Sequence, residues 1–136
     1  MSTAITYQTD TKISVDEFID VLVRSTLAER RPVNDRQRIQ KMLDHGNIII
    51  TAWSDGLLVG VSRAVTDFSY CCYLSDLAVD KDFQHRGIGN ELIRLTHRAA
   101  GEQTMLILIA APKAIAYYPK IGMKNFPHCF VFDRKK

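Results

Sequence analysis

The sequence has few cysteines, little net charge and no clustered basic face, and each absence excludes a class of protein. Its 136 residues include three cysteines, Cys71, Cys72 and Cys129. An odd count, with two adjacent cysteines and no CxxC pair, supports neither a disulfide framework nor a zinc site. We therefore expect packing cysteines in the reducing cytoplasm and no metal. The formal charge of +3, spread along the chain, argues against a nucleic-acid partner.

Long hydrophobic segments are also missing. The longest uninterrupted apolar run, residues 105–112, is far shorter than the roughly 20 residues that cross a bilayer. The opening MSTAITYQTD lacks the basic and apolar regions of a signal peptide, so no membrane partner is expected. What is present is ordinary globular composition, 46% hydrophobic and 24% charged, which predicts a single domain over residues 1–136.

Hydrophobic spacing predicts strands and helices throughout the first half. Residues 5–8 are typical of a short strand, and Ser14 followed by Glu17 forms a capping box that predicts the start of an amphipathic helix. A second helix is predicted from Asn34 to Gly46. Two apolar, β-branched runs joined through an Asp-Gly pair predict a β-hairpin over residues 47–65.

The second half predicts a strand over residues 70–79, a helix over 88–99, and a strand over 105–110 that should run parallel to the first. The apolar run 104–112 is typical of a strand covered on both faces. A short helix over 113–118 and strand-like residues 125–133 end the chain. The expected fold is therefore α/β, a mixed parallel and antiparallel central sheet with helices on both faces. Its expected order is β-α-α-β-β-β-α-β-α-β, with room for one more strand.

Two glycines stand one residue apart in QHRGIGN, where the strand pattern gives way to a helix pattern. Glycine costs roughly 0.5–1 kcal/mol relative to alanine inside a regular element. Gly87 and Gly89 could expose helix-start amides to an anion such as phosphate, or could merely shape a tight turn. A Walker A loop is excluded because GxxxxGK[ST] does not occur. A dinucleotide fingerprint is excluded because Leu92 stands where its third glycine is required.

Two motifs around these glycines resemble those of the GNAT superfamily of N-acetyltransferases, in particular its small single-domain bacterial-type members. The family's pyrophosphate motif, Q/R-x-x-G-x-G/A, is matched by residues 84–89, and the strand before it by residues 77–79. A later family motif, FYxKxGF, is matched by YYPKIGM at residues 117–123. The expected order of elements also agrees along essentially the whole chain.

The resemblance implies acetyl-coenzyme A as co-substrate, lying where two parallel strands, residues 70–79 and 105–110, splay apart. Backbone groups freed by the splay would bind the pantetheine arm, and amides of the QHRGIGN turn would bind the pyrophosphate. The implied binding residues are Leu77, Ala78, Val79, Gln84, His85, Arg86, Gly87, Ile88, Gly89 and Asn90. The asparagine that often binds pantetheine in the family is replaced here by Ala111, so that contact is absent.

The implied chemistry is direct attack of a neutral amine on the thioester in a ternary complex. The backbone N–H of Leu77 would meet the developing oxyanion, and Tyr118 would protonate the leaving thiolate as general acid. Because Pro119 follows, we expect Tyr118 to leave helical dihedrals and cap its helix.

The general base stays open at this point. On a regular strand Tyr73, Ser75 and Leu77 share one face and Asp76 points to the other. Tyr73 could position a water molecule or line the acceptor pocket, and Asp76 could act directly. A water-mediated route is the default.

For the acceptor, the resemblance indicates the loop between the first two helices, residues 68–73 and the C-terminal residues 125–130. Arg30 and Arg31 are candidates to hold an acceptor carboxylate, and Tyr70 and Tyr73 to form an aromatic wall. The predicted function is N-acetylation of a primary amine on a small molecule, with a homodimer left open. The alternatives are a protein lysine or N-terminal acetyltransferase and a non-catalytic acyl-coenzyme A sensor.

Overall fold

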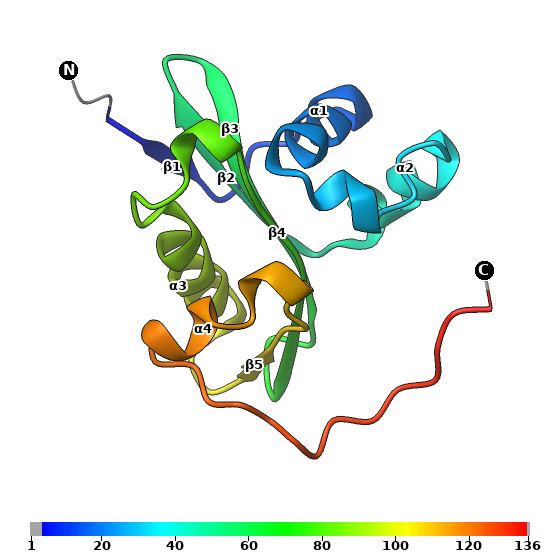
Figure 1. The fold of residues 1–136 in the computed structure, drawn as a ribbon, viewed down its shortest axis with the longest axis vertical. Coiled ribbons are helices and arrows are strands. Elements are labelled where there is room, and N and C mark those ends of the chain that lie inside the picture. Colours follow the sequence, from blue (N-terminus) through cyan, green and yellow to red (C-terminus); the bar gives the residue numbers. More distant parts are fainter. Residues whose placement is uncertain (1–3, 136) are drawn as a thin grey trace.

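The computed structural model of the protein describes residues 4–135, so both ends of the domain expected over residues 1–136 lie outside the described residues. These described residues form five strands and four α-helices (Figure 1). In order they are β1 Thr6–Gln8, α1 Val15–Ser25, α2 Arg36–His45, β2 Ile48–Ser54, β3 Leu57–Thr66, β4 Cys71–Val79, α3 Ile88–Ala100, β5 Met105–Ile107 and α4 Tyr117–Lys120. Three short 3-10 helices join them: η1 Leu27–Arg30, η2 Lys81–Phe83 and η3 Pro112–Ala114.

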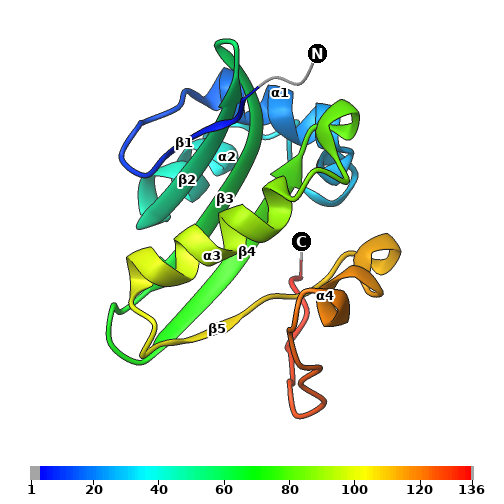
Figure 2. The same cartoon turned by 90° about the vertical axis from the view of Figure 1, so that its left-hand side faces the viewer.

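The strands form one sheet in the order β1-β2-β3-β4-β5. Neighbouring strands from β1 to β4 pair antiparallel, and β4 pairs parallel with β5. Helices α1 and α2 lie on one face and α3 crosses the other (Figures 1 and 2). The expected α/β fold with a mixed sheet is therefore confirmed. Among residues 4–135, none of the helices has the length and apolar content to cross a bilayer.

Two local signals in the first half are confirmed. The Ser14 hydroxyl accepts a hydrogen bond from the Glu17 amide at 3.1 Å, and the Glu17 carboxylate accepts one from the Ser14 amide at 2.9 Å. This is the expected capping box. At the expected hairpin, Asp55 and Gly56 both have positive φ, 49° and 79°, as a tight two-residue turn between antiparallel strands requires.

Helix α2 begins two residues later than expected, at Arg36 rather than Asn34. Asp35 is its N-cap, because the Asp35 carboxylate accepts a hydrogen bond from the Arg38 amide at 3.1 Å. Aspartate and asparagine cap helices about equally well, so the sequence pattern does not distinguish neighbouring candidates. The expected stop at Gly46 is confirmed.

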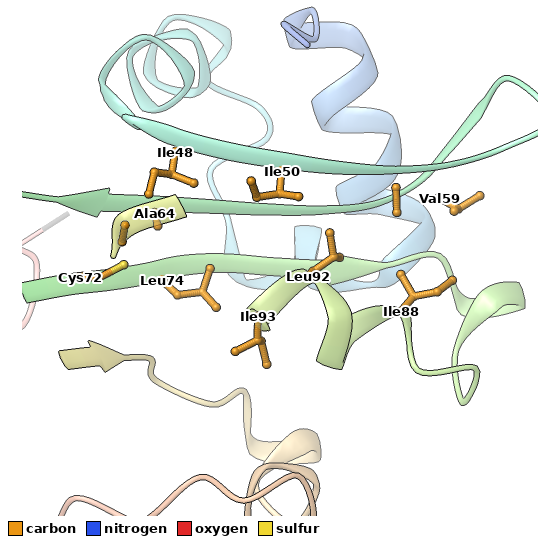
Figure 3. Packing of buried hydrophobic residues seen from close by; sticks show 11 residues of the cluster. Ile48, Ile50, Val59, Ala64, Cys72, Leu74, Ile88, Leu92 and Ile93 are labelled. Carbon is orange, nitrogen blue, oxygen red and sulfur yellow. The ribbon is translucent and has the colours of Figure 1, made fainter. Parts of the chain in front are cut away.

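An apolar cluster on each face of the sheet holds the helices in place. The cluster under α3 is drawn in Figure 3 and comprises Ile48, Ile50, Ala52, Val59, Ala64, Cys72, Leu74, Ile88, Leu92, Ile93 and Ala100. The cluster under α1 and α2 comprises Val15, Phe18, Val21, Leu22, Ile39, Leu43, Leu58, Val61 and Ala78. Burying one large aliphatic side chain stabilises the fold by roughly 1.5–3 kcal/mol. Helix α3 is therefore held firmly against β2, β3 and β4.

A β-bulge interrupts β4. Arg63 of β3 pairs with Asp76, but the next residue, Ala64, pairs with Leu74. Ser75 is thus one extra residue on β4, and an extra residue bends a strand and shifts its alternation.

The bulge overturns one expectation about this strand. Leu74 and Leu77 both pack against the cluster under α3, although they are three positions apart. Tyr73, directly before Leu74, points to the opposite face by the alternation of a strand. Tyr73 and Leu77 therefore lie on opposite faces of the sheet, and the expectation that they share a face is wrong.

A buried carboxylate on β4 ties together three segments on the α1–α2 face. Asp76 is fully buried, and its two oxygens accept hydrogen bonds from Nε of Arg31 and Nε of Arg63. Arg31 also donates to the Ser75 carbonyl at 2.8 Å, and Arg63 donates to the Met42 carbonyl at 3.2 Å. The network fastens the residue after η1 and the end of α2 to the bulge.

The C-terminal half departs from expectation at β5, which spans Met105–Ile107 rather than residues 105–110. The expectation that this apolar run is covered on both faces is also wrong, since Met105 and Ile109 are 59% and 58% exposed. Leu106 and Leu108 pack against the cluster under α3. The residues that alternate with them, such as Met105 and Ile109, point to the other face. On that face α1 packs over β3 and β4 and leaves β5 uncovered.

The last expected elements are also corrected. The helix expected over residues 113–118 is divided into η3 and α4. The described residues 123–135 form no strand, although 125–133 have strand-like composition. Figure 1 shows this segment, in red, running away from the sheet. Its Phe130 is 90% exposed. With no neighbouring strand beside it, the segment gains nothing from its β propensity.

Replacing Asp76 with alanine is expected to lower the free energy of unfolding by about 3–5 kcal/mol, because it leaves two arginines without their partner. Urea denaturation measures the loss. Asp16→Ala is the matched control, since Asp16 pairs with Arg36 on the exposed surface and should cost under about 1 kcal/mol. Equal losses in both variants would contradict a structural role for the buried network.

Candidate active site

Strands β4 and β5 pair over three residues and then separate. Cys71–Tyr73 pairs with Met105–Ile107. Beyond that point, β4 residues between 74 and 79 and chain residues between 108 and 114 line opposite sides of a cleft of about 520 Å³. Residues of η1 line a further side. A gap between the two parallel strands is therefore present where the sequence analysis placed it.

Backbone groups of Leu77 and Val79 face this cleft. Hydrogen-bonded positions alternate along an antiparallel ladder, and the Asp80 amide donates to the Val59 carbonyl of β3 at 2.8 Å. Alternate residues before Asp80 therefore bond to β3, which directs the N–H and C=O groups of Leu77 and Val79 to the edge that β5 has left. The Val79 carbonyl already accepts one hydrogen bond, from the Gln84 side-chain amide at 3.0 Å.

Helix α3 begins with bare amides. Its N-cap, Gly87, has φ 80° and no side chain to cap the first turn. A Cβ added at Gly87 would meet no atom within 4 Å, so the turn leaves open space there. The N-cap residue thus supplies no partner for the amides of Ile88 and Gly89, whereas the Asn90 amide faces the Tyr117 hydroxyl. Together with the helix dipole, such amides favour an anion like phosphate.

The side chains before this helix shape the loop. The Arg86 guanidinium lies 5.0 Å from the centre of the Phe83 ring and donates to the Asp82 carbonyl at 3.3 Å. The Gln84 side chain is bonded to the Val79 carbonyl at the end of β4. His85 is exposed and has a φ of 65°. The amides of the turn are therefore the groups best directed toward an anion, with Arg86 close by.

Tyr118 lies inside α4 and lines the cleft. The expectation that Pro119 would move it out of helical geometry is wrong. A proline is tolerated in the first helical turn, where its missing N–H would have no partner anyway. Burial raises the pKa of Tyr118 above its usual value of 10.0, and the neighbouring Tyr117 adds a smaller effect in the same direction. The Tyr118 phenol therefore keeps its proton at neutral pH and can donate it.

Charged side chains from η1 and η3 line the cleft. Glu29, Arg30 and Lys113 line it with exposed side chains. Arg31 lines it too, but the Arg31 guanidinium is held by Asp76. Because both Asp76 oxygens are occupied and buried, neither is free to accept a proton from a substrate.

Two expected residues lie apart from this arrangement. Neither Tyr70 nor Tyr73 is among the described residues that line the cleft. Tyr70 precedes β4 and is 80% exposed, and Tyr73 points away from Leu77 because of the bulge. Conversely, neither Glu29 nor Lys113 stands out in the sequence, since a lone charged residue in a connecting segment forms no pattern.

Metal and thiol chemistry find little support in the described part of the chain. Residues 4–135 contain no group of three or more histidine, cysteine or acidic side chains that could hold a metal ion. Cys72 is buried, which raises the pKa of its thiol. The other two cysteines are exposed, and none of the three is among the described residues that line the cleft.

Comparison with known proteins identifies related sequences and related structures. An uncharacterized N-acetyltransferase, ycf52, of Porphyra purpurea is 30% identical over 106 residues, which cover 72% of this chain and 58% of that protein. This chain thus spans less than two thirds of the length of that relative. A GNAT-family acetyltransferase of Streptococcus pneumoniae, SP0256, superposes with a TM-score of 0.79 at 18% identity over 98% of this chain and all of that one.

The aminoglycoside N-acetyltransferase AAC(6')-Iy in complex with CoA superposes with a TM-score of 0.75 at 15% identity, covering 100% of this chain and 98% of that chain. At such identities the superpositions show a shared fold. The family itself is shown by sequence, because residues 15–123 match the model of the acetyltransferase (GNAT) family. The splayed strands, the glycine turn before α3 and this match together establish that the chain belongs to the GNAT family of acetyltransferases.

Proposed function

We propose that the chain is an acetyl-coenzyme A-dependent N-acetyltransferase that acetylates a primary amine of a small molecule by direct attack in a ternary complex. The observation that carries this proposal is that the freed backbone of Leu77 and Val79 lines the same cleft as Tyr118. The lining of this cleft also includes Gln84, in the loop that leads to the amides at the start of α3.

Acetyl-coenzyme A fits the residues at this end of the cleft. Its diphosphate would lie over the amides between His85 and Asn90, which lack an N-cap side chain, with Arg86 adding positive charge nearby. Its pantetheine arm would hydrogen-bond to backbone groups of Leu77 and Val79. The coenzyme supplies an acetyl thioester and a thiolate leaving group. A protein of the same fold in complex with CoA supports the choice of coenzyme.

Two groups of the chain would act on the reacting atoms. The Leu77 N–H faces the cleft without a partner from β5, so it can donate to the oxyanion that forms when the amine attacks the carbonyl carbon. The C–S bond then breaks, and the leaving thiolate has a pKa of about 8.5 when free. Tyr118 lines the same cleft and holds its proton, so it can protonate that sulfur.

A base must first take the proton of the amine. For a lysine-like amine, neutralisation at pH 7 costs roughly 4.6 kcal/mol, from about 3.4 pKa units. Glu29 is the one carboxylate among the described residues lining the cleft. We therefore propose that a water molecule passes the proton toward Glu29, and that neither Tyr73 nor Asp76 takes part in this transfer.

The charges around the cleft favour an acceptor that carries both signs. Glu29 can attract an ammonium group, while the exposed Arg30 and Lys113 can hold a carboxylate or another anion. Arg31 is less suited to that role because Asp76 already binds it. A small zwitterion such as an amino acid fits this set better than a polycation. The acceptor class, the homodimer and the cytoplasmic location all stay predictions.

Tyr118→Phe is expected to lower kcat by about 10²–10⁴-fold, the usual contribution of a general acid, and to leave CoA affinity unchanged. Stopped assays of thiol release and isothermal titration measure the two quantities. Since the pKa of Tyr118 is raised, its acid form persists through neutral pH. Deprotonation of Tyr118 should therefore cause no fall in kcat as the pH is raised toward 10. An unaltered kcat would remove Tyr118 from the mechanism.

Gly87→Ala tests the amides at the start of α3. Its left-handed φ of 80° should cost an alanine about 1–2 kcal/mol of stability, and the distorted turn should weaken CoA binding. Gly56→Ala is the matched control, because Gly56 has φ 79° and equally open surroundings in the hairpin between β2 and β3. Both variants should lose similar stability in urea, but only Gly87→Ala should lose CoA affinity. Parallel losses of affinity would argue against a diphosphate site at α3.

An acceptor panel distinguishes the remaining functions. We expect acetyl-coenzyme A turnover with free amino acids, and expect Arg30→Ala to raise KM about tenfold for these zwitterions, as the loss of one charged hydrogen bond would. KM for a simple alkylamine should not change. Turnover restricted to peptides would favour the protein acetyltransferase. CoA binding without turnover of any amine would favour the sensor.

A further inference from the structure

Tyr117 places a phenol against the first turn of α3. A Cβ added at Gly89 would lie 3.4 Å from the Tyr117 hydroxyl oxygen and 3.9 Å from Cγ2 of Val79. The backbone amide of Asn90 faces the same oxygen. The hydroxyl therefore stands beside the bare amides to which the proposed function assigns the coenzyme diphosphate.

Packing accounts for the Tyr117 ring, and the Asn90 amide gives its hydroxyl oxygen a donor, but neither uses the hydroxyl proton. The ring meets that of Tyr118 edge to face, with centroids 5.2 Å apart and an interplanar angle of 77°. A phenylalanine would keep this contact, and phenylalanine is the residue that the family motif FYxKxGF has at this position. The hydroxyl of this chain is thus an addition at a place where the motif needs only a ring.

Tyr117 is half-buried, and among the described residues none is seen to accept a hydrogen bond from its hydroxyl. Partly desolvating a polar group is costly unless a hydrogen bond is regained. Burial raises the pKa of Tyr117, and the Asn90 amide offsets part of that effect. The group therefore keeps its proton at neutral pH and has a donor to offer.

We propose that Tyr117 is a coenzyme-binding residue: its hydroxyl accepts a hydrogen bond from the Asn90 amide and donates one to a diphosphate oxygen, alongside the amide of Gly89. The inference rests on the proposed function, since it requires the diphosphate at the start of α3. It separates the two adjacent tyrosines by role: Tyr117 holds the coenzyme, and Tyr118 donates a proton to its sulfur.

Isothermal titration of the wild type and of Tyr117→Phe tests this, with CoA and with pantetheine, which lacks the diphosphate. Losing one hydrogen bond to a charged group should raise the Kd for CoA about tenfold, while the Kd for pantetheine stays the same. In steady state, KM for acetyl-coenzyme A should rise with kcat unchanged, the reverse of the Tyr118→Phe pattern. Tyr70→Phe is the control, because the Tyr70 phenol is 80% exposed ahead of β4 and is not among the described residues that line the cleft. This variant should bind CoA normally.

Equal or tighter CoA binding by Tyr117→Phe would overturn the inference, since the hydroxyl would then only cap the helix or compete with the ligand. An equal loss for CoA and pantetheine would also overturn it, because the effect would not depend on the diphosphate. A wild type that binds no CoA would end the proposed function itself, whereas binding without a Tyr117 effect ends the inference alone.

A second measurement does not depend on how the variant folds. In wild-type protein labelled at tyrosine 13Cζ, the Tyr117 resonance should shift on addition of CoA and stay in place on addition of pantetheine. An unmoved resonance at saturating CoA would overturn the proposal.

Discussion

The separation of β4 from β5 is the constraint on which the rest of the molecule depends. A strand inside a sheet normally has both edges paired, and unpaired backbone groups away from water are costly. Here β4 has β3 on one edge throughout but β5 on the other for only three residues. The sheet is therefore built with a row of backbone donors and acceptors that a ligand can satisfy, and the bulge at Ser75 marks the point where regular alternation stops.

Two packed layers place other groups at this opening. The cluster under α3 fixes that helix on β2, β3 and β4, so its first turn lies near the end of β4. Across the cleft, α4 brings Tyr118 to the lining and Tyr117 to Gly89. The two glycines thus have different surroundings: Gly87 supplies a left-handed turn, and Gly89 lies beside a phenol that comes from 28 residues further along the chain.

Buried electrostatics decide which charges remain available to an acceptor. Asp76 takes the guanidinium groups of Arg31 and Arg63, which joins the segment after η1 to β4 and removes Arg31 from the set of free cations. Adjacent arginines that look equivalent in the sequence thereby acquire different roles. Arg30 remains exposed on the cleft beside Glu29, and this contrast depends on a partner 45 residues away from Arg31.

The sequence by itself determined the features whose causes lie within a few residues. The capping box at Ser14, the hairpin turn at Asp55, the glycine turn before α3 and the order of the elements up to α4 all follow from local dihedral preferences, caps and apolar spacing. Only the tertiary structure decided the bulge that turns Tyr73 away from Leu77, the engagement of Arg31, the contact between Tyr117 and the α3 amides, and the exposed face of β5. Each of these depends on which distant segment lies alongside. Spacing in one sequence carries no record of such pairings, because propensity acts on neighbours along the chain and packing acts on neighbours in space.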